Sequence, residues 1–258
     1  MENPNDTDTL NSSAYIDFGI THEDVYTVHD YLRRSVPTEL ADLILDAAQY
    51  WPCVSSERTD DAAPFVVHAS SGTGAAAYYL VTPPIPAHPR TRPIQIQGVV
   101  FTLRSCDQGW GGDDRYIGTY NGSYSWFEAG IVRDSLLGVE DQLSSQGSLR
   151  TFHEFDDAAF GRSLGREVEN PLEPTRRWNL QFNLQVSRTV KRHEIVWTKD
   201  DVFDDGVEAE AMTKGAGTGR GFVSTLRPGD RVALVVKAQY PGWANHVSGA
   251  SIRIFYSV

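Results

Sequence analysis

The sequence has few of the residues that build disulfide frameworks and metal centres. Its 258 residues include two cysteines, Cys53 and Cys106, which lie far apart and by themselves form neither a disulfide framework nor a metal site. The seven histidines are scattered, and neither His153 nor His193 opens an H-E-x-x-H motif. We therefore expect a protein without a metal ion or other cofactor, in a reducing compartment.

Long apolar runs and runs of basic residues are also missing. No apolar stretch approaches the roughly 18 residues that a membrane-spanning helix needs. The formal net charge is −11, and basic residues occur only as isolated pairs such as Arg33-Arg34 and Lys191-Arg192. Because an acidic surface repels phosphate backbones, a nucleic-acid partner is disfavoured. These absences predict a cytoplasmic protein that binds neither nucleic acid nor a membrane.

What the sequence does contain is a globular composition and many short strand patterns. Hydrophobic residues make up 40% of the chain and aromatic residues 11%, which excludes a disordered chain. Alternating or β-branched runs predict strands at 64–69, 77–82, 94–106, 115–120, 123–132, 178–186, 192–198 and within 231–258. The predicted fold class is mainly β: an antiparallel β-sandwich of jelly-roll, galactose-binding-like type over residues 57–258.

Strands that are close in sequence are expected to pair. Residues 231–258 are typical of a hairpin-like pair, the Asn121-Gly122 turn predicts a hairpin of 115–120 with 123–132, and 178–186 is expected to pair with 192–198. Gly98 marks a predicted bulge. Residues 134–175 are predicted to form a mobile excursion, and the acidic and glycine-rich stretch after residue 199 a long surface loop.

The N-terminal part of the chain has a different period. Residues 1–20 are expected to be flexible, and residues 21–56 to form a helical hairpin packed on the sandwich, with helices at about 22–34 and 37–51. The letters V-P-T-E-L at 36–40 and L-I-L at 43–45 resemble the opening of an F-box, which docks ubiquitin-ligase adaptors onto their scaffold. A helical pair that simply packs on the sheet is the favoured interpretation.

Two loops combine aromatic, amide and ionisable groups beside glycines. The first, 105–114, contains Asp107, Gln108 and Trp110, and the second, 240–246, contains Tyr240, Trp243, Asn245 and His246. Aromatic faces stack on sugar C–H surfaces, and carboxylates and amides add directional hydrogen bonds. We expect both loops at one end of the sandwich, forming a ligand-binding surface with Trp126. Replacing Trp243 or Asn245 should then remove binding without lowering stability, unless both indoles plug the core.

The same loops carry a resemblance. The letters D-Q-G-W at 107–110, T-Y-N-G-S-Y-S-W-F-E at 119–128, P-G-D-R at 228–231 and Y-P-G-W-A-N-H-V at 240–247 resemble the motif series of a group of fungal proteins without assigned function. The likeness covers roughly residues 97–258. It brings no established activity and no established catalytic residues. The order of helices and sandwich is also similar to that of sugar-binding F-box proteins, at the level of the fold alone.

Other motifs lack the context that their chemistry needs. G-R-S-L-G at 161–165 matches a nucleophile elbow but has no apolar strand before it and no apolar helix after it. G-A-G-T-G at 215–219 lacks the lysine of a phosphate-binding loop. Acidic pairs such as Asp113-Asp114 lack the alternating spacing of a calcium loop.

Three functions are consistent with these patterns. The first is a non-catalytic binding module that recognises a carbohydrate-like small molecule or a protein partner through its end loops. The second is a cofactor-free cyclase, isomerase or hydrolase in which Asp107, Glu128 and His246 transfer protons. The third is an F-box-like ubiquitin-ligase adaptor. The first two differ in whether Asp107, Glu128 and His246 face one enclosed pocket.

Overall fold

The structure is a computed structural model. It describes residues 7–9, 15, 18–70, 74–87, 94–133, 151–153, 165–173, 177–200 and 205–257. The predictions made for residues 1–6, for 134–150 and for the 161–164 part of the G-x-S-x-G motif lie outside the described residues. In the described part, no helix has the length and apolar character to cross a membrane.

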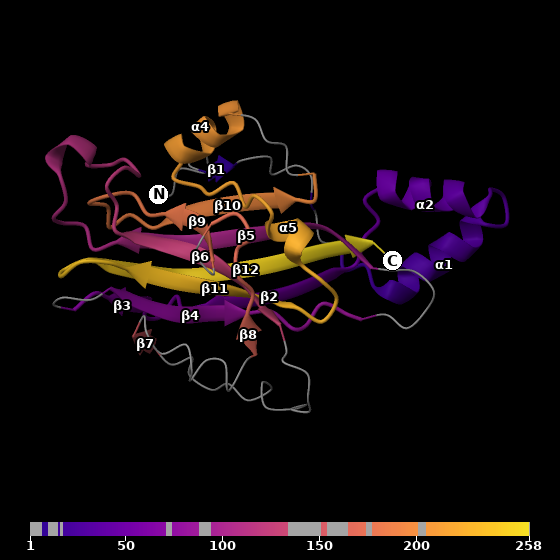
Figure 1. The fold of residues 1–258 in the computed structure, drawn as a ribbon, viewed down its shortest axis with the longest axis horizontal. Coiled ribbons are helices and arrows are strands. Elements are labelled where there is room, and N and C mark those ends of the chain that lie inside the picture. The colour runs from indigo at the N-terminus through magenta and orange to yellow at the C-terminus, as the bar shows by residue number, and fades with distance from the viewer. Residues whose placement is uncertain are drawn as a thin grey trace.

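Two six-stranded sheets form the body of the protein (Figure 1). Sheet A contains β1 (Thr7–Thr9), β10 (Lys191–Thr198), β5 (Gln95–Asp107), β12 (Ala244–Ser257) and β2 (Cys53–Thr59) in this order, with β3 (Phe65–His68) also paired to β12. Sheet B contains β7 (Thr151–His153), β4 (Ala75–Val81), β11 (Arg231–Ala238), β6 (Ser125–Arg133) and β8 (Arg166–Glu167), with β9 (Trp178–Phe182) also paired to β6. All pairs are antiparallel except β1 with β10.

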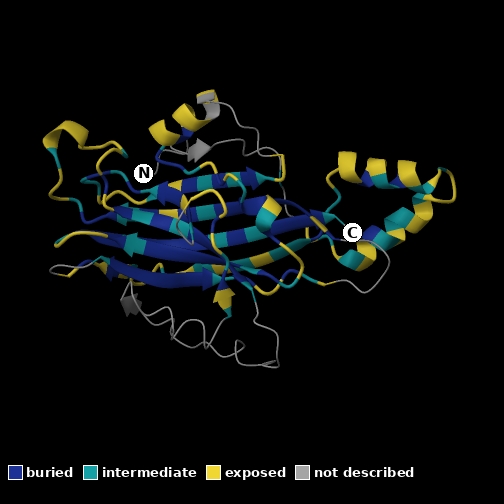
Figure 2. Cartoon of the chain, in the orientation of Figure 1, coloured by how far each residue is buried: buried dark blue, intermediate teal, exposed yellow. Residues whose placement is uncertain are grey.

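The hydrophobic core lies between the two sheets. Phe101 and Ile252 of sheet A and Phe127 and Leu234 of sheet B are fully buried members of one cluster. Figure 2 shows this buried layer running along the strands of both sheets. The predicted mainly β fold, an antiparallel sandwich with an N-terminal helical pair, is confirmed.

The expected pairing of the last two strands is wrong. β11 lies in sheet B between β4 and β6, whereas β12 lies in sheet A between β5 and β2. The short connection at 239–243 therefore crosses from one sheet to the other instead of closing a hairpin. Alternation shows which residues share a face of a strand, but it does not specify the neighbouring strand.

Two more expected pairs are also wrong, the first because one of its strands is not formed and the second because its strands join different sheets. Residues 114–116 form a short 3₁₀ helix, η1 (Asp114–Tyr116), so the turn at Asn121-Gly122 does not join two strands. β9 pairs with β6 in sheet B, and β10 pairs with β5 in sheet A. The stretch predicted as a long surface loop contains α4 (Asp205–Thr213) and α5 (Phe222–Thr225).

The irregularity predicted at Gly98 is present. The register between β5 and β12 changes between Phe255, which faces Gly98, and Tyr256, which faces Ile96. A Cβ atom at Gly98 would lie 2.8 Å from the Tyr15 ring and 2.9 Å from the carbonyl oxygen of Trp197. Glycine is required here because the Tyr15 ring packs directly on the strand.

Two helices stand off one end of the sandwich (Figure 1). They are α1 (His22–Leu32) and α2 (Thr38–Ala47). α1 begins with a capping box in which Thr21 and Asp24 each bind the other's main-chain N–H. The link to β12 runs through Tyr256, whose hydroxyl lies 3.4 Å from His22 Nδ1 and whose N–H donates to Pro52 O.

Candidate functional site

The end of the sandwich opposite the helical pair carries the two loops that the sequence singles out. β5 ends at Asp107 and β12 begins at Ala244, and Asp107 and Asn245 are direct neighbours in the ladder between these strands. Gln108 links the loops, because its Oε1 accepts a 3.1 Å hydrogen bond from the N–H of Ala244. The structure therefore brings the loops 105–114 and 240–246 together.

The 240–243 segment is a tight turn with the features of type II. The N–H of Trp243 donates to Tyr240 O at 3.2 Å, Pro241 follows Tyr240, and Gly242 has a φ of 91°. A Cβ at Gly242 would lie 2.8 Å from Cη2 of Trp110. The turn thus needs glycine at position 242 for two reasons: the backbone has a positive φ, and the Trp110 ring packs where a side chain would be.

Aromatic rings cover this turn in two layers. The Tyr124 ring meets the Tyr240 ring at 4.6 Å and the Trp243 ring at 5.2 Å, both edge to face. Trp243 is only 8% exposed, whereas Trp110 and Tyr240 are 55% and 50% exposed. Trp243 is therefore the support, and we call the exposed rings of Trp110, Tyr124 and Tyr240 the aromatic platform.

The backbone of Tyr240 is strained. Its φ of 69° lies in the left-handed region, which a non-glycine residue occupies at a cost of about 1 kcal/mol or more. Strain of this kind persists where the surrounding structure holds it, and it is concentrated at functional sites. Here it holds a half-exposed aromatic ring at the tip of a loop.

Asp107, predicted to bind ligand, is buried and hydrogen-bonded to the protein's own main chain. It is 1% exposed, and its carboxylate accepts hydrogen bonds from the N–H groups of Gly109, Val186 and Ser187 at 2.7, 2.6 and 2.8 Å. Val186 has a φ of 58°, so the carboxylate fixes a strained loop. Burial raises the pKa of Asp107, although these three hydrogen bonds and nearby His246 act in the opposite direction.

Gln108 and Asn245 also serve the scaffold. Gln108 is 5% exposed and uses its amide to bind Trp110 O and Ala244 N. Asn245 is fully buried and accepts a 3.0 Å hydrogen bond from Asn183. The expectation that Trp243 and Asn245 face a ligand is therefore corrected: both are buried, because the loops close over the end of the core.

The three candidate proton carriers do not form one group. Asn245 points between the sheets, so the next residue, His246, faces the outside of sheet A, where it neighbours Cys106. Glu128 lies on the outside of sheet B and bonds to Trp126, Lys237 and Arg177. Burial lowers the pKa of His246, as do Arg188 and His68, while Asp107 raises it.

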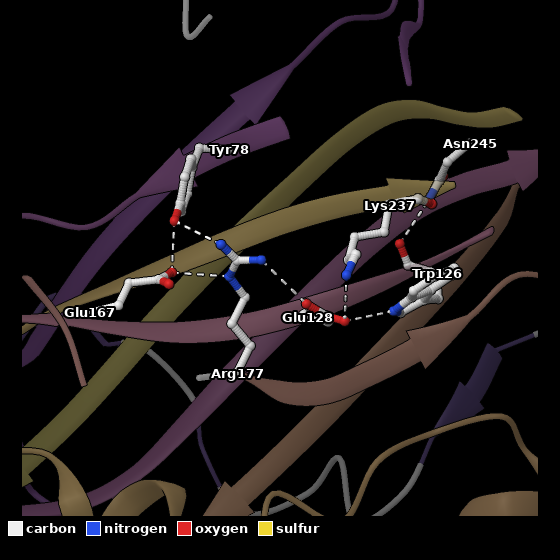
Figure 3. A network of polar contacts seen from close by, with 7 residues as sticks. All are labelled: Tyr78, Trp126, Glu128, Glu167, Arg177, Lys237 and Asn245. Atoms are coloured by element: carbon white, nitrogen blue, oxygen red, sulfur yellow. Dashed lines mark hydrogen bonds and ion pairs between the residues drawn. The ribbon is translucent and has the colours of Figure 1, made fainter. Parts of the chain in front are cut away.

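The Trp126 ring makes its contacts on sheet B. Its Nε1 donates to Glu128 Oε1 at 2.9 Å, and the Lys237 ammonium lies 5.1 Å from its ring centre (Figure 3). The ring is thus packed under a cation of sheet B. Its main-chain carbonyl, not its side chain, connects it to the loop end, through Asn245.

A charged network lies on sheet B, and of its charged residues Glu128 alone was predicted to be functional (Figure 3). Arg177 bonds to Glu167 at 3.0 Å and to the Tyr78 hydroxyl at 3.0 Å, and its NH1 lies 3.6 Å from Glu128. Burial alone would lower the pKa of Arg177, but Glu167 and Tyr78 raise it above its usual value. Since the charges neutralise one another, we interpret this network as a brace of the sheet.

Comparison with known proteins gave no match to a family model, to a curated protein or to a solved structure. The resemblance to fungal proteins therefore stays a prediction from the motifs. Among the described residues, no three His, Cys, Asp or Glu side chains are grouped as metal ligands.

Proposed function

We propose that the protein is a non-catalytic binding module that recognises a carbohydrate-like ligand with its aromatic platform. The observation that carries this proposal is the two-layered arrangement of the loop end. Trp110, Tyr124 and Tyr240 are exposed, while buried Trp243 and the strained turn hold them in place. Large aromatic side chains are costly to leave in water unless a ligand or partner covers them.

The chemistry of the platform suits a sugar. An aromatic face packs against the apolar C–H surface of a pyranose ring, and the tyrosine hydroxyl and indole N–H add hydrogen bonds at the ring edge. Trp110 and Tyr240 belong to loops tied together by Gln108, so their relative positions are fixed before a ligand arrives. Pre-organisation of this kind lowers the entropic cost of binding.

A catalytic function has less support. General acid–base catalysis needs two ionisable groups within reach of one substrate. The Asp107 carboxylate is buried and accepts three main-chain hydrogen bonds, and Glu128 is paired with cations on the other sheet. Of the three, His246 is partly exposed, and among the described residues it forms no ion pair.

A glycan array followed by calorimetry tests the proposal. The labelled full-length chain should bind a defined set of glycans, and Trp110→Ala or Tyr240→Ala should each weaken binding about tenfold, the loss expected when one aromatic contact is removed. Tyr31→Ala is the matched control, because Tyr31 is an exposed tyrosine on the remote α1. Glycan binding that survives both platform substitutions, or no glycan binding at all, would contradict the proposal. In the latter case a protein ligand for the platform is the alternative to pursue.

A further inference from the structure

The helical pair carries an apolar surface that the sandwich does not cover. Leu40, Leu43 and Ile44 of α2 are 47%, 62% and 42% exposed. Leu43 and Ile44 each lie about one turn from Leu40, on the same side of the helix. Figure 2 shows that α2 presents an exposed side away from the rest of the molecule. We call these three side chains the α2 stripe.

The stripe is separate from the contacts that hold the helices together. The buried residues are Val25 of α1 and Ala41 and Leu45 of α2. A 2.9 Å bond between His29 and Asp42 also joins the two helices. Leu40, Leu43 and Ile44 are not among these buried contacts, so much of their apolar surface is available to a partner.

The charge around the stripe limits what can cover it. Each of the two helices carries three carboxylates and neither contains lysine or arginine, while Arg33 and Arg34 follow α1 in the turn between them. A second copy of this chain, docked stripe to stripe, would bring acidic helices against each other. A positively charged partner would instead gain attraction at the rim while it buries the leucines.

We propose that the α2 stripe is the docking site for an amphipathic helix of a protein partner, whose apolar face is flanked by lysine or arginine. An apolar face of this kind fits residues spaced by three and four positions, which is the common mode of helix-on-helix recognition. The exposed carboxylates of Glu39 and Asp46, next to the stripe on α2, select basic partners and disfavour self-association. This inference does not depend on the ligand of the aromatic platform.

Three labelled helical peptides of about 20 residues probe the site in the full-length chain. The first carries a leucine stripe flanked by lysines, the second the same stripe flanked by glutamates, and the third the same lysines with the leucines scattered. Fluorescence anisotropy should show binding of the first peptide alone, weakening as salt screens the rim charges. The third peptide measures non-specific attraction to an acidic protein.

Substitutions in the protein test whether the first peptide binds at the α2 stripe. Leu43→Ser combined with Ile44→Ser should weaken the first peptide about tenfold or more, because two buried apolar contacts are lost. Glu39→Lys, at an exposed position beside the stripe, should weaken it several-fold. Met212→Ser, a 70% exposed apolar side chain on α4, is the matched control and should change nothing. Circular dichroism verifies that each variant is folded.

Several outcomes would overturn the proposal. These are equal binding of the lysine and glutamate peptides, no binding of any peptide, or binding that is unaffected by the serine pair. Sedimentation equilibrium provides a further check: a dimer that the serine pair dissociates would make a second copy of this chain the occupant. Trp110→Ala should leave peptide binding intact, so failure here is distinguishable from failure at the aromatic platform.

Discussion

The Asn245 side chain donates a 2.9 Å hydrogen bond to the main-chain carbonyl of Trp126 and so connects sheet A to sheet B. The same amide accepts from Asn183, which also donates to Ser125 and accepts from Ser105. All four of these side chains are almost completely buried. A satisfied polar network of this kind fixes how the sheets meet at the loop end, below the aromatic platform.

Replacement of Asn245 should therefore destabilise the domain. Asn245→Ala removes one acceptor of the buried Asn183 amide and the donor to the Trp126 carbonyl, at a cost of about 2–4 kcal/mol in the free energy of unfolding. Urea denaturation measures this loss. Asn121→Ala, at an exposed position of the same end, is the control and should leave the midpoint unchanged. A stable Asn245→Ala protein would show that the network is not a structural link.

The two loop tryptophans should respond differently to substitution. Trp243→Ala removes a buried ring that Tyr124 contacts, and should cost about 3–5 kcal/mol. Trp110→Ala removes a half-exposed ring and should cost less than about 1 kcal/mol. Thermal unfolding of both variants tests whether Trp243 supports the loop end and Trp110 only lies on its surface. Equal losses would mean that Trp110 is part of the core closure.

His246 should make stability depend on pH in a known direction. Burial, Arg188 and His68 lower its pKa in the folded protein, against the opposing effect of Asp107. The unfolded chain then binds the proton more readily, so the stabilising contribution is present above pH about 6.5 and is lost as the pH falls below it. Denaturation midpoints between pH 7.5 and 5 should fall less steeply in His246→Gln than in the original protein. Parallel curves would refute this assignment.

Arg177 should be essential for the brace on sheet B. Arg177→Ala leaves the Glu167 carboxylate, whose side chain is 3% exposed, buried beside the Tyr78 hydroxyl without its cation. Loss of one partner of a buried ion pair costs about 3–5 kcal/mol. Arg115→Ala breaks the exposed pair with Asp113 and should have no measurable effect. The difference between the two unfolding midpoints is the test, and similar midpoints would show that the brace contributes little.

Much of the local structure was predictable from the sequence. The helical pair before the sandwich and the irregularity at Gly98 each follow from residues that are close in the sequence. The juxtaposition of the loops was also foreseen, because glycine-bracketed aromatic and amide residues follow one strand and precede another. The roles of individual loop residues were not foreseen. Asp107, Asn245 and Trp243 have the chemistry of a binding site, and only their burial shows that they serve the scaffold.

The sequence by itself determined that this chain forms a β-sandwich with two helices before it, since alternation, capping and turn residues act over a few neighbouring positions. Only the tertiary structure decided that β11 and β12 belong to different sheets, and that Tyr78, Glu167 and Arg177 meet. The physical reason is that the period of a strand shows which side chains share a face, whereas the neighbouring strand is selected by the packing of the whole core. Contacts between residues about 90 positions apart leave no local signal in the sequence.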